Sequence, residues 1–338
     1  MEKQAIDNIT DKTYELCVVC NTYNQSSYIK DALDGFVLQR TKFPYVCVIV
    51  DDASTDGNQK VISKYIDDHF DTSTSICEDT DDYFLTVTWH NDNANCCFAV
   101  FLLKYNHYSR PKINYRRREY YARFFNNAKY NAYCEGDDYW CHPDFIQKCV
   151  SFLNDNSEYS AVFGNKIVSD KDGNRISKTR FKRELNVRDI MRGTNMGIRN
   201  LIFRKEIRNT PPFVDKARDM YIYYQCAVRG RMHYIDEDFA IYRLTGEGVY
   251  SKLNKEAKIR TSYEHYYQFH AAVEFKYQKQ YVEYQIKELV SYIEDKDCYR
   301  YCKSLIAEYR VPSVKRYLWY PFFFILYYAV RLKNKFIK

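Results

Sequence analysis

The sequence lacks the features that mark several common classes of protein. It contains no zinc-finger spacing, no aromatic pattern of an RNA-recognition module and no long basic arm, so we expect no nucleic acid partner. The first residues, from Met1 to Thr13, are polar and contain no apolar core of a signal peptide. No uncharged apolar run reaches the ~20 residues that a helix needs to span a bilayer. These absences favour a cytoplasmic chain whose twelve cysteines stay reduced.

The composition is that of a folded globular protein. The chain has 338 residues, 46% of them apolar, which is enough for one large domain or two smaller ones. Lysine and arginine exceed aspartate and glutamate by 51 − 44 = 7, a balance that suits an anionic ligand or an anionic membrane surface. Cys17 and Cys20 have the CxxC spacing, but they lie inside an apolar run that predicts a buried strand. We therefore expect no zinc or redox site there.

The first seventy residues alternate between strand patterns and helix patterns. Two short apolar runs, Tyr14 to Cys20 and Tyr45 to Val50, predict buried strands. A helix is expected after the first strand, capped by Ser26 or Ser27, and a second helix from about Asn58 to Phe70. This β-α-β-α order with short loops predicts a parallel α/β sheet, in which ligands bind at the carboxyl ends of the strands.

The middle of the chain is less regular. Residues 71–83 are polar and acidic and predict a loop, and the apolar stretch from Ala94 to Tyr105 has no clear period, so we assign it no element. Helices are expected at residues 116–126, from residues 142–144 to about 153, and at 219–229. Strands are expected at residues 85–89, 130–134, 160–168, 201–203 and 232–242.

The last third has a different character. Residues 254–309 are charged, rich in tyrosine and compatible with helices, which indicates a separate helical region. Residues 317–330 are aromatic and uncharged, and basic residues flank them on both sides. This pattern favours association of residues 314–338 with the surface of an anionic membrane. The alternative is a terminal helix that packs on the domain.

Pairs of carboxylates follow two of the predicted strands. Asp137 and Asp138 come after the strand at residues 130–134, and Asp51 and Asp52 close the second strand. Adjacent carboxylates repel one another unless a cation or hydrogen bonds relieve them, and a divalent cation bound there can neutralise a departing diphosphate. An isolated pair is often a solvated turn, but several polar strand ends at one edge of a sheet indicate a ligand site.

Three segments together resemble family 2 glycosyltransferases, which have the GT-A fold. The segments are Val18-Val19-Cys20-Asn21-Thr22-Tyr23-Asn24, Val48-Ile49-Val50-Asp51-Asp52-Ala53-Ser54-Thr55-Asp56 and Cys134-Glu135-Gly136-Asp137-Asp138-Tyr139-Trp140. The order and spacing fit over roughly residues 14–251. The resemblance implies a Rossmann-like α/β sheet that binds a nucleotide-sugar donor, a UDP-sugar in particular, together with Mn²⁺ or Mg²⁺.

The resemblance also assigns roles to individual residues. The diphosphate and metal fall to the third segment, with Asp138 on the metal and Asp137 on the ribose, the sugar or the metal. Arg243 is a further candidate for the sugar or diphosphate. The nucleotide falls to residues of the first two segments: Thr22, Tyr23, Asn24, Asp51, Asp52 and Ser54.

The acceptor half matches the family more loosely. Asp219 resembles the acidic residue before a helix that acts as the general base of an inverting reaction, although aspartate at that place is also a common helix cap. Asp215 competes for this role, and Asp236, Glu237 and Asp238 do so more remotely.

One part of the family pattern is absent from the acceptor half. Thr245 stands near a position where relatives often carry a histidine, and residues 248–251 read Gly-Val-Tyr-Ser instead of Gly-Val-Trp-Ser. A ligand to the metal or diphosphate is missing as a result, unless His233 or Arg243 replaces it.

We therefore expect a catalytic domain at residues 1–253, with a nucleotide-binding half at 14–140 and an acceptor half at 141–253, and a helical extension at 254–338. The expected activity is metal-dependent, inverting transfer of one sugar to a saccharide or lipid-linked acceptor in surface glycan synthesis, on the inner face of the membrane. A non-catalytic sugar-nucleotide or glycan-binding protein of the same fold is the alternative. A nucleotidyltransferase is disfavoured because residues 21–27 contain no glycine, lysine or arginine.

Overall fold

The computed structural model describes residues 13–110, 112–207, 214, 216–248, 252–289 and 295–309. These residues form two compact units. The first comprises the described residues up to Leu185 and those within Met196–Asn209 and Cys226–Gly246. The second comprises those within Asn186–Asn195 and Thr210–Gln225 and those from Glu247 onward. The contacts that define these units divide the chain at places other than residue 253. The expected domain boundary at that residue stays a prediction.

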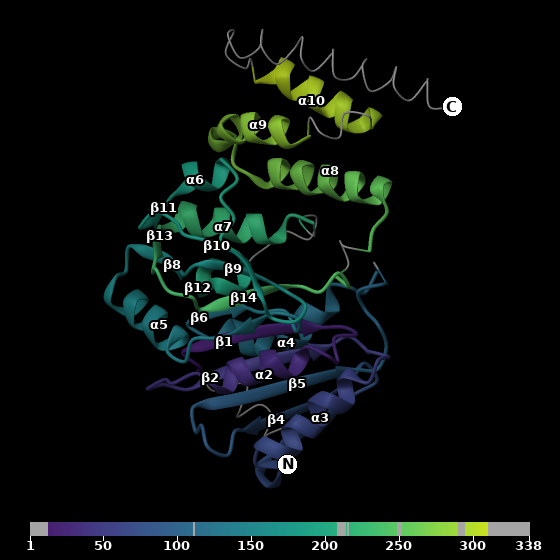
Figure 1. The fold of residues 1–338 in the computed structure, drawn as a ribbon, viewed down its shortest axis with the longest axis vertical. Helices are drawn as coiled ribbons and strands as arrows, with labels where there is room; N and C mark the ends of the chain where they lie inside the picture. The colour runs from purple at the N-terminus through teal and green to yellow at the C-terminus, as the bar shows by residue number, and fades with distance from the viewer. Residues whose placement is uncertain are drawn as a thin grey trace. The chain divides into compact units, whose positions relative to one another are not determined.

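A mixed ten-stranded sheet dominates the first unit (Figure 1). Its centre is parallel: β1 pairs with β2 on one side and with β6 on the other, and β2 pairs with β5. This confirms the α/β fold class expected from the sequence. In sheet order the strands are β11 (Glu184–Leu185), β13 (Arg231–Tyr234), β8 (Tyr159–Phe163), β12 (Leu201–Arg204), β6 (Tyr130–Tyr133), β1 (Leu16–Thr22), β2 (Tyr45–Asp51), β5 (Cys96–Leu103), β4 (Tyr83–Trp89) and β3 (Ile76–Asp79).

Helices cover both faces of the sheet, which explains why its central strands are apolar throughout. The core on one face joins alternate residues of the strands to three helices, α2 (Ile29–Val37), α3 (Asn58–His69) and α5 (Phe145–Asp155). On this face α2 and α3 contact each other (Figure 1). The helix α4 (Arg116–Asn127) contacts β1 and β2 and buries Phe124 and Phe125.

A small second sheet completes the first unit. Its strands, in sheet order, are β10 (Arg175–Thr179), β9 (Lys166–Asp170), β14 (Ala240–Leu244) and β7 (Tyr139–Trp140). Because β7 directly follows the Glu135–Asp138 segment, this sheet connects that segment to the later half of the chain. Gly35 lets α2 approach β7 closely, since a Cβ atom there would lie 2.6 Å from the carbonyl oxygen of Trp140.

The second unit is helical. The helix α9 (Phe275–Leu289) contacts α6 (Val187–Met191), α8 (Lys255–Ala272) and α10 (Lys296–Glu308). Its buried side chains Val282 and Ile286 pack with Leu305, Ile306 and Tyr309. The helical character expected for residues 254–309 is confirmed where these residues are described. Among the described residues, no helix combines the length and apolar character that crossing a bilayer requires, and the aromatic segment 317–330 lies outside them.

Four local predictions were wrong. Neither Ser26 nor Ser27 caps α2, because the carbonyl oxygen of Gln25 accepts the N–H groups of Tyr28 and Ile29 at its start. Residues 71–83 include the strand β3, which pairs with β4, and the unassigned stretch 94–105 contains β5. The runs 160–168 and 232–242 each contain two strands that belong to different sheets, and the first run changes sheet at Gly164 and Asn165.

Candidate functional site

Three strand ends from the sequence motifs meet at one edge of the large sheet. Thr22 at the end of β1 is paired in register with Asp51 at the end of β2, and the Asp52 N–H donates to the Thr22 carbonyl oxygen at 3.0 Å. The loop after β6 joins them, because the Gly136 N–H donates to the Asn21 carbonyl oxygen at 3.1 Å. The structure therefore brings the three segments together, as the sequence motifs predicted.

Gly136 permits the closest approach in this group. A Cβ atom at this position would lie 2.7 Å from Thr22 Oγ1 and 2.7 Å from Gln25 Oε1. A side chain larger than hydrogen would push the loop away from β1. The next residue, Asp137, remains partly exposed, and its pKa is raised because burial outweighs the hydrogen bond from Gln25 and the nearby arginines Arg199 and Arg243. Asp137, unlike the buried Asp138, is thus a carboxylate of this loop that a ligand can reach.

Asp51 is completely buried and supports the loop that follows β2. One oxygen accepts the Ser54 N–H at 2.9 Å and the Gln59 amide at 2.8 Å. The other accepts the Ser54 hydroxyl at 2.6 Å and the Asn58 amide at 2.7 Å. With an exposed fraction of 0% and four hydrogen bonds, Asp51 holds the loop in shape. This arrangement leaves no space for a direct contact between Asp51 and a nucleotide.

Asn24 links the loop after β1 to the loop after β2. Its N–H donates to Ser54 Oγ at 2.9 Å, and its side-chain oxygen accepts the Thr55 N–H at 2.8 Å. Asn24 has a φ of 52°, a left-handed conformation that asparagine adopts more readily than most residues. Tyr23, beside it, exposes 45% of its surface. Of the predicted nucleotide contacts, Tyr23 is therefore the side chain most open to a ligand.

The Asp52 carboxylate accepts hydrogen bonds from residues 107–108, a segment that no sequence motif marked. One carboxylate oxygen accepts the His107 N–H at 2.7 Å, and the other accepts the Tyr108 N–H at 2.9 Å. The Arg117 guanidinium lies 3.5 Å from the carboxylate, and the exposed fraction of Asp52 is 2%. A base can reach Asp52 only if residues 106–108 move. No periodicity or motif in residues 104–110 predicted this contact.

Asp138 forms a deeply buried ion pair at the site with Arg199. One oxygen accepts the Arg199 Nε–H, and the other accepts the Arg243 N–H at 3.0 Å. Its exposed fraction is 1%, and burial raises its pKa to about 6 against the lowering effect of Arg199. Arg199 also lies 4.1 Å from the centre of the Tyr242 ring. Arg199, in the 3-10 helix η2 (Ile198–Asn200), was missed because no sequence pattern connects it with Asp138.

Arg243 lies beside this pair. Its guanidinium is 5% exposed, lies over the rings of Tyr28 and Tyr139, and donates to Asp31. Its Nε and Nη1 atoms are buried and have no hydrogen-bond partner within the part of the chain that the structure describes. The guanidinium charge also lowers the pKa of Asp137. The structure therefore brings Arg243 to the Asp137–Asp138 segment, as a sugar or diphosphate contact requires.

The predicted general base belongs to the other unit. Asp219 is exposed and lies in the first turn of α7 (Arg218–Arg229), and its charge acts on His265 of α8. The helix-start position is thus confirmed, whereas the catalytic role stays a prediction. Asp215 and residues 249–251 lie outside the described residues.

The remaining competitors for the base or for the missing histidine have partners elsewhere. Glu237 pairs with Lys148 and Asp238 with Lys178, at 2.6 and 2.7 Å. Asp236 pairs with Arg180 at 3.0 Å. His233 stacks on Phe152 with 3.9 Å between ring centres, which places its ring in a packed environment. These side chains stabilise the fold, and Arg243 is the better substitute for the missing ligand.

A divalent cation fits the site only if a bound nucleotide and water supply some of its ligand oxygens. Within the described parts of the chain, no three histidine, cysteine or acidic side chains gather closely enough to hold a metal ion alone. Mg²⁺ and Mn²⁺ at nucleotide sites commonly take one or two carboxylates and fill their other positions with phosphate oxygens and water. Asp137 satisfies this need. Asp138 can serve as a second ligand if Arg199 gives up its bond.

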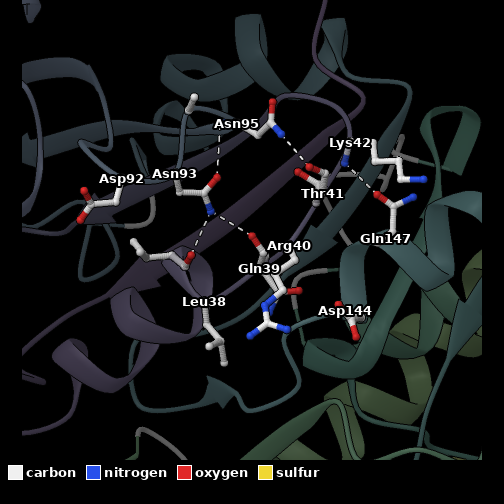
Figure 2. Close-up of a pocket in the computed structure, with 12 residues that line it drawn as sticks. Leu38, Gln39, Arg40, Thr41, Lys42, Asp92, Asn93, Asn95, Asp144 and Gln147 are labelled. Carbon is white, nitrogen blue, oxygen red and sulfur yellow. Dashed lines mark hydrogen bonds between the residues drawn. The ribbon is translucent and has the colours of Figure 1, made fainter.

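A separate groove of about 630 Å³ lies at the opposite edge of the sheet (Figure 2). It is lined by the segment after α2 and by residues that precede β5 and α5. The Asn93 amide crosses it and donates to the carbonyl oxygens of Val37 and Gln39 at 3.0 and 2.9 Å. Because strands β2 and β5 begin here, this groove is distinct from the carboxyl-end site.

Comparisons with known proteins agree with this architecture. Residues 17–77 match the family model for glycosyl transferase family 2. The structure resembles the crystal structure of Staphylococcus aureus TarS 1–349 in complex with UDP-GlcNAc, with a TM-score of 0.51 and 15% sequence identity over 83% of this chain and 81% of that one. The matched segment is therefore similar to glycosyl transferase family 2, and the described residues share the GT-A fold of TarS.

Two relatives extend the sequence similarity beyond the matched segment. Rv1520 of Mycobacterium tuberculosis is 26% identical over 248 residues, which cover 70% of this chain and 60% of the length of Rv1520. A Bacillus subtilis protein, described as a candidate teichuronic acid biosynthesis glycosyltransferase and called TuaG, is 23% identical over 245 residues, covering 71% of this chain and 83% of TuaG. The chain thus spans only 60% of the mycobacterial relative that it matches.

Proposed function

We propose that the protein transfers a single sugar from a nucleotide-sugar donor, a UDP-sugar in particular, to a saccharide or lipid-linked saccharide in the synthesis of a surface glycan. The observation that carries the proposal is the approach of the Glu135–Asp138 loop to β1, where Gly136 lies against Thr22 and Gln25 and Asp137 follows directly. The family match over residues 17–77 covers the other side of the same site. The relationship to TuaG supports the surface-glycan context.

In this proposal the chain binds the donor at the carboxyl edge of the large sheet. The exposed ring of Tyr23 offers a face for the base, and Asp137 is the accessible anionic group for a Mn²⁺ or Mg²⁺ ion. Such a cation supplies charge neutralisation for the departing diphosphate. Arg199 and Arg243 add fixed positive charge on the same side, which stabilises the growing negative charge of the leaving group.

Proton removal from the acceptor requires a second carboxylate. A positioned carboxylate can take the proton of the attacking hydroxyl, and direct attack inverts the anomeric centre. We assign this role to Asp219, which is exposed at the start of α7. If Asp219→Asn retains the full kcat of the wild type with a productive acceptor, this assignment fails.

A second candidate function has its own observation. Asp52 and Asp138, two residues expected to contact the donor, are both closed off by internal partners. This favours a protein of the same fold that binds a sugar nucleotide or glycan without turnover. Calorimetry with UDP-sugars and Mn²⁺, followed by an assay of donor hydrolysis, separates the two. Binding without hydrolysis or transfer over a panel of acceptors supports the second candidate.

We also propose peripheral membrane association on the cytoplasmic face through residues 314–338, which lie outside the described residues. The basic residues that flank the aromatic run in the sequence support this. Deletion of residues 314–338 should release the protein from liposomes that contain anionic lipid. If the full chain does not sediment with such liposomes, the proposal is wrong.

A further inference from the structure

Lys166 is a cation for which the described part of the chain provides no counter-ion. It is the first residue of β9, is partly buried, and forms no ion pair or side-chain hydrogen bond with any described residue. Its register partners are Ala240 on β14 and Thr179 on β10. A partly desolvated ammonium group without a partner costs free energy. Lys178 on β10 avoids that cost, because it pairs with Asp238 at 2.7 Å.

A second positive charge, that of Arg199, acts on Lys166. The pKa of Lys166 is lowered by burial and by the charge of Arg199. The sheet register explains this proximity: Val168 pairs with Tyr242, so Lys166 and Tyr242 project from the same face of the small sheet. Arg199 lies over the Tyr242 ring at 4.1 Å. Two cations therefore share one face of the small sheet, and Asp138 is bonded to only one of them.

Thr179 adds a hydroxyl group to this face. It lies directly opposite Lys166 in the antiparallel pair of β9 and β10, where side chains on the same face come within about 5 Å of each other. A lysine, an arginine and a hydroxyl give several donors and up to two positive charges. A group with many acceptor oxygens and one or two negative charges matches them, and a phosphoryl group has both properties.

We propose that Lys166, Thr179 and Arg199 form a subsite that binds a phosphoryl group at the edge of the donor site. This deepens the proposed function and rests on it for the identity of the ligand. The phosphoryl group has two possible sources in a glycosyl transfer: the diphosphate of the donor, or a phosphate carried by the acceptor. Lys166 comes from the half of the chain expected to bind the acceptor, while Arg199 contacts Asp138, so the geometry is compatible with both sources.

Three variants of the full-length chain test the subsite. Lys166→Gln removes the charge, Lys166→Arg retains it, and Lys178→Gln is the matched control that removes a lysine paired with Asp238. Without ligand, Lys166→Gln should melt at the temperature of the wild type or above it, because no ion pair is lost. Lys178→Gln should melt lower. A fall for Lys166→Gln as large as that for Lys178→Gln would show a structural role and count against the subsite.

Calorimetry then distinguishes the two sources. In the first arm, UDP with Mn²⁺ is titrated into each variant; about tenfold weaker binding to Lys166→Gln, restored by Lys166→Arg, identifies the diphosphate of the donor. In the second arm, inorganic phosphate is titrated into each variant, both free and saturated with UDP and Mn²⁺. Binding by the saturated wild type that Lys166→Gln loses identifies a phosphate of the acceptor.

The outcomes also separate this inference from the proposed function. If Lys166→Gln binds UDP and phosphate as tightly as the wild type does, the subsite is refuted even though a UDP site exists. If the wild type does not bind UDP, the UDP-sugar proposal fails, and the phosphate titration of the free protein still measures the contribution of Lys166. The control Lys178→Gln should match the wild type in both arms.

Discussion

Arg199 donates to a carboxylate oxygen of Asp138, and the Asp138 carboxylate is 1% exposed. The two residues are 61 positions apart in the sequence, and their pairing joins the loop after β6 to the segment before β12. A buried carboxylate that loses the cation paired with it is left with uncompensated charge. The pair is therefore both a structural element of the donor site and a source of fixed charge within it.

The first prediction concerns this pair. Arg199→Met should destabilise the fold by about 3–5 kcal/mol at neutral pH, because it leaves Asp138 buried without a cation. Unfolding in urea measures the loss. Arg231→Met is the control, since Arg231 pairs with Glu158 on the surface at 3.3 Å and should cost at most about 1 kcal/mol. Equal effects of the two substitutions would show that the Asp138 pair contributes no more than a surface pair.

A second prediction concerns the approach of the Gly136 loop to β1. Gly136→Ala should weaken binding of UDP and Mn²⁺ by tenfold or more, because the new methyl group would lie 2.7 Å from Thr22 Oγ1. Titration calorimetry measures this. Gly173→Ala is the control: nothing lies within 4 Å of its Cβ position, and its φ of +89° imposes backbone strain only. Wild-type affinity in Gly136→Ala would mean that this contact does not shape the site.

A third prediction separates two roles for Asp52. If Asp52 mainly orders residues 106–108, Asp52→Asn should speed hydrogen exchange at the His107 and Tyr108 amides, since an asparagine side chain offers only one acceptor oxygen to the two N–H groups. A stability loss of about 1–3 kcal/mol should accompany it. Loss of UDP binding with unchanged exchange at both amides would instead assign Asp52 to the nucleotide.

A fourth prediction concerns acid stability. His90 Nδ1 accepts the N–H groups of Asp92 and Asn93, both at 3.0 Å, and burial lowers the His90 pKa. A histidine whose pKa is lowered by folding contributes stability above its unfolded pKa of about 6.5, and this contribution is lost as the pH falls through the folded value. The free energy of unfolding should therefore decrease on acidification from pH 7 to pH 5. In His90→Asn the part of this decrease that is due to His90 should be absent. An identical pH profile for both proteins would contradict the assignment.

Much of the fold could be predicted from the sequence because local patterns determine it. The central strands β1 and β2 are uninterrupted apolar runs followed by polar residues, so their type and their ligand-binding ends could be inferred together. The stretch that forms β5 is buried on both faces and has no period, and a buried strand of this kind cannot be separated from a buried helix by pattern alone. The strand β3 is short and polar and forms only through pairing with β4.

Part of the site could also be predicted from local sequence patterns. The positions of Thr22, Asp51 and Asp137 follow from strand ends and motifs. The partners that close off Asp52 and Asp138 come from residues 107–108 and from Arg199, which are brought there by the tertiary fold. Long-range pairs of this kind leave no periodic pattern in a single sequence. Lys166 was missed because what distinguishes it is the lack of an ion-pair partner among the described residues. A single sequence does not show which lysines are paired.

The most direct test of the account is donor hydrolysis by the full-length chain, measured with a UDP-sugar panel in Mn²⁺ and in chelator, for the wild type and for Asp137→Asn. We expect hydrolysis or transfer with at least one donor in Mn²⁺, its loss in chelator, and a decrease of at least tenfold in Asp137→Asn with an unchanged melting temperature. Equal rates in Mn²⁺ and chelator, or an Asp137→Asn variant as active as the wild type, would contradict the assignment of the Glu135–Asp138 loop as the metal–diphosphate site.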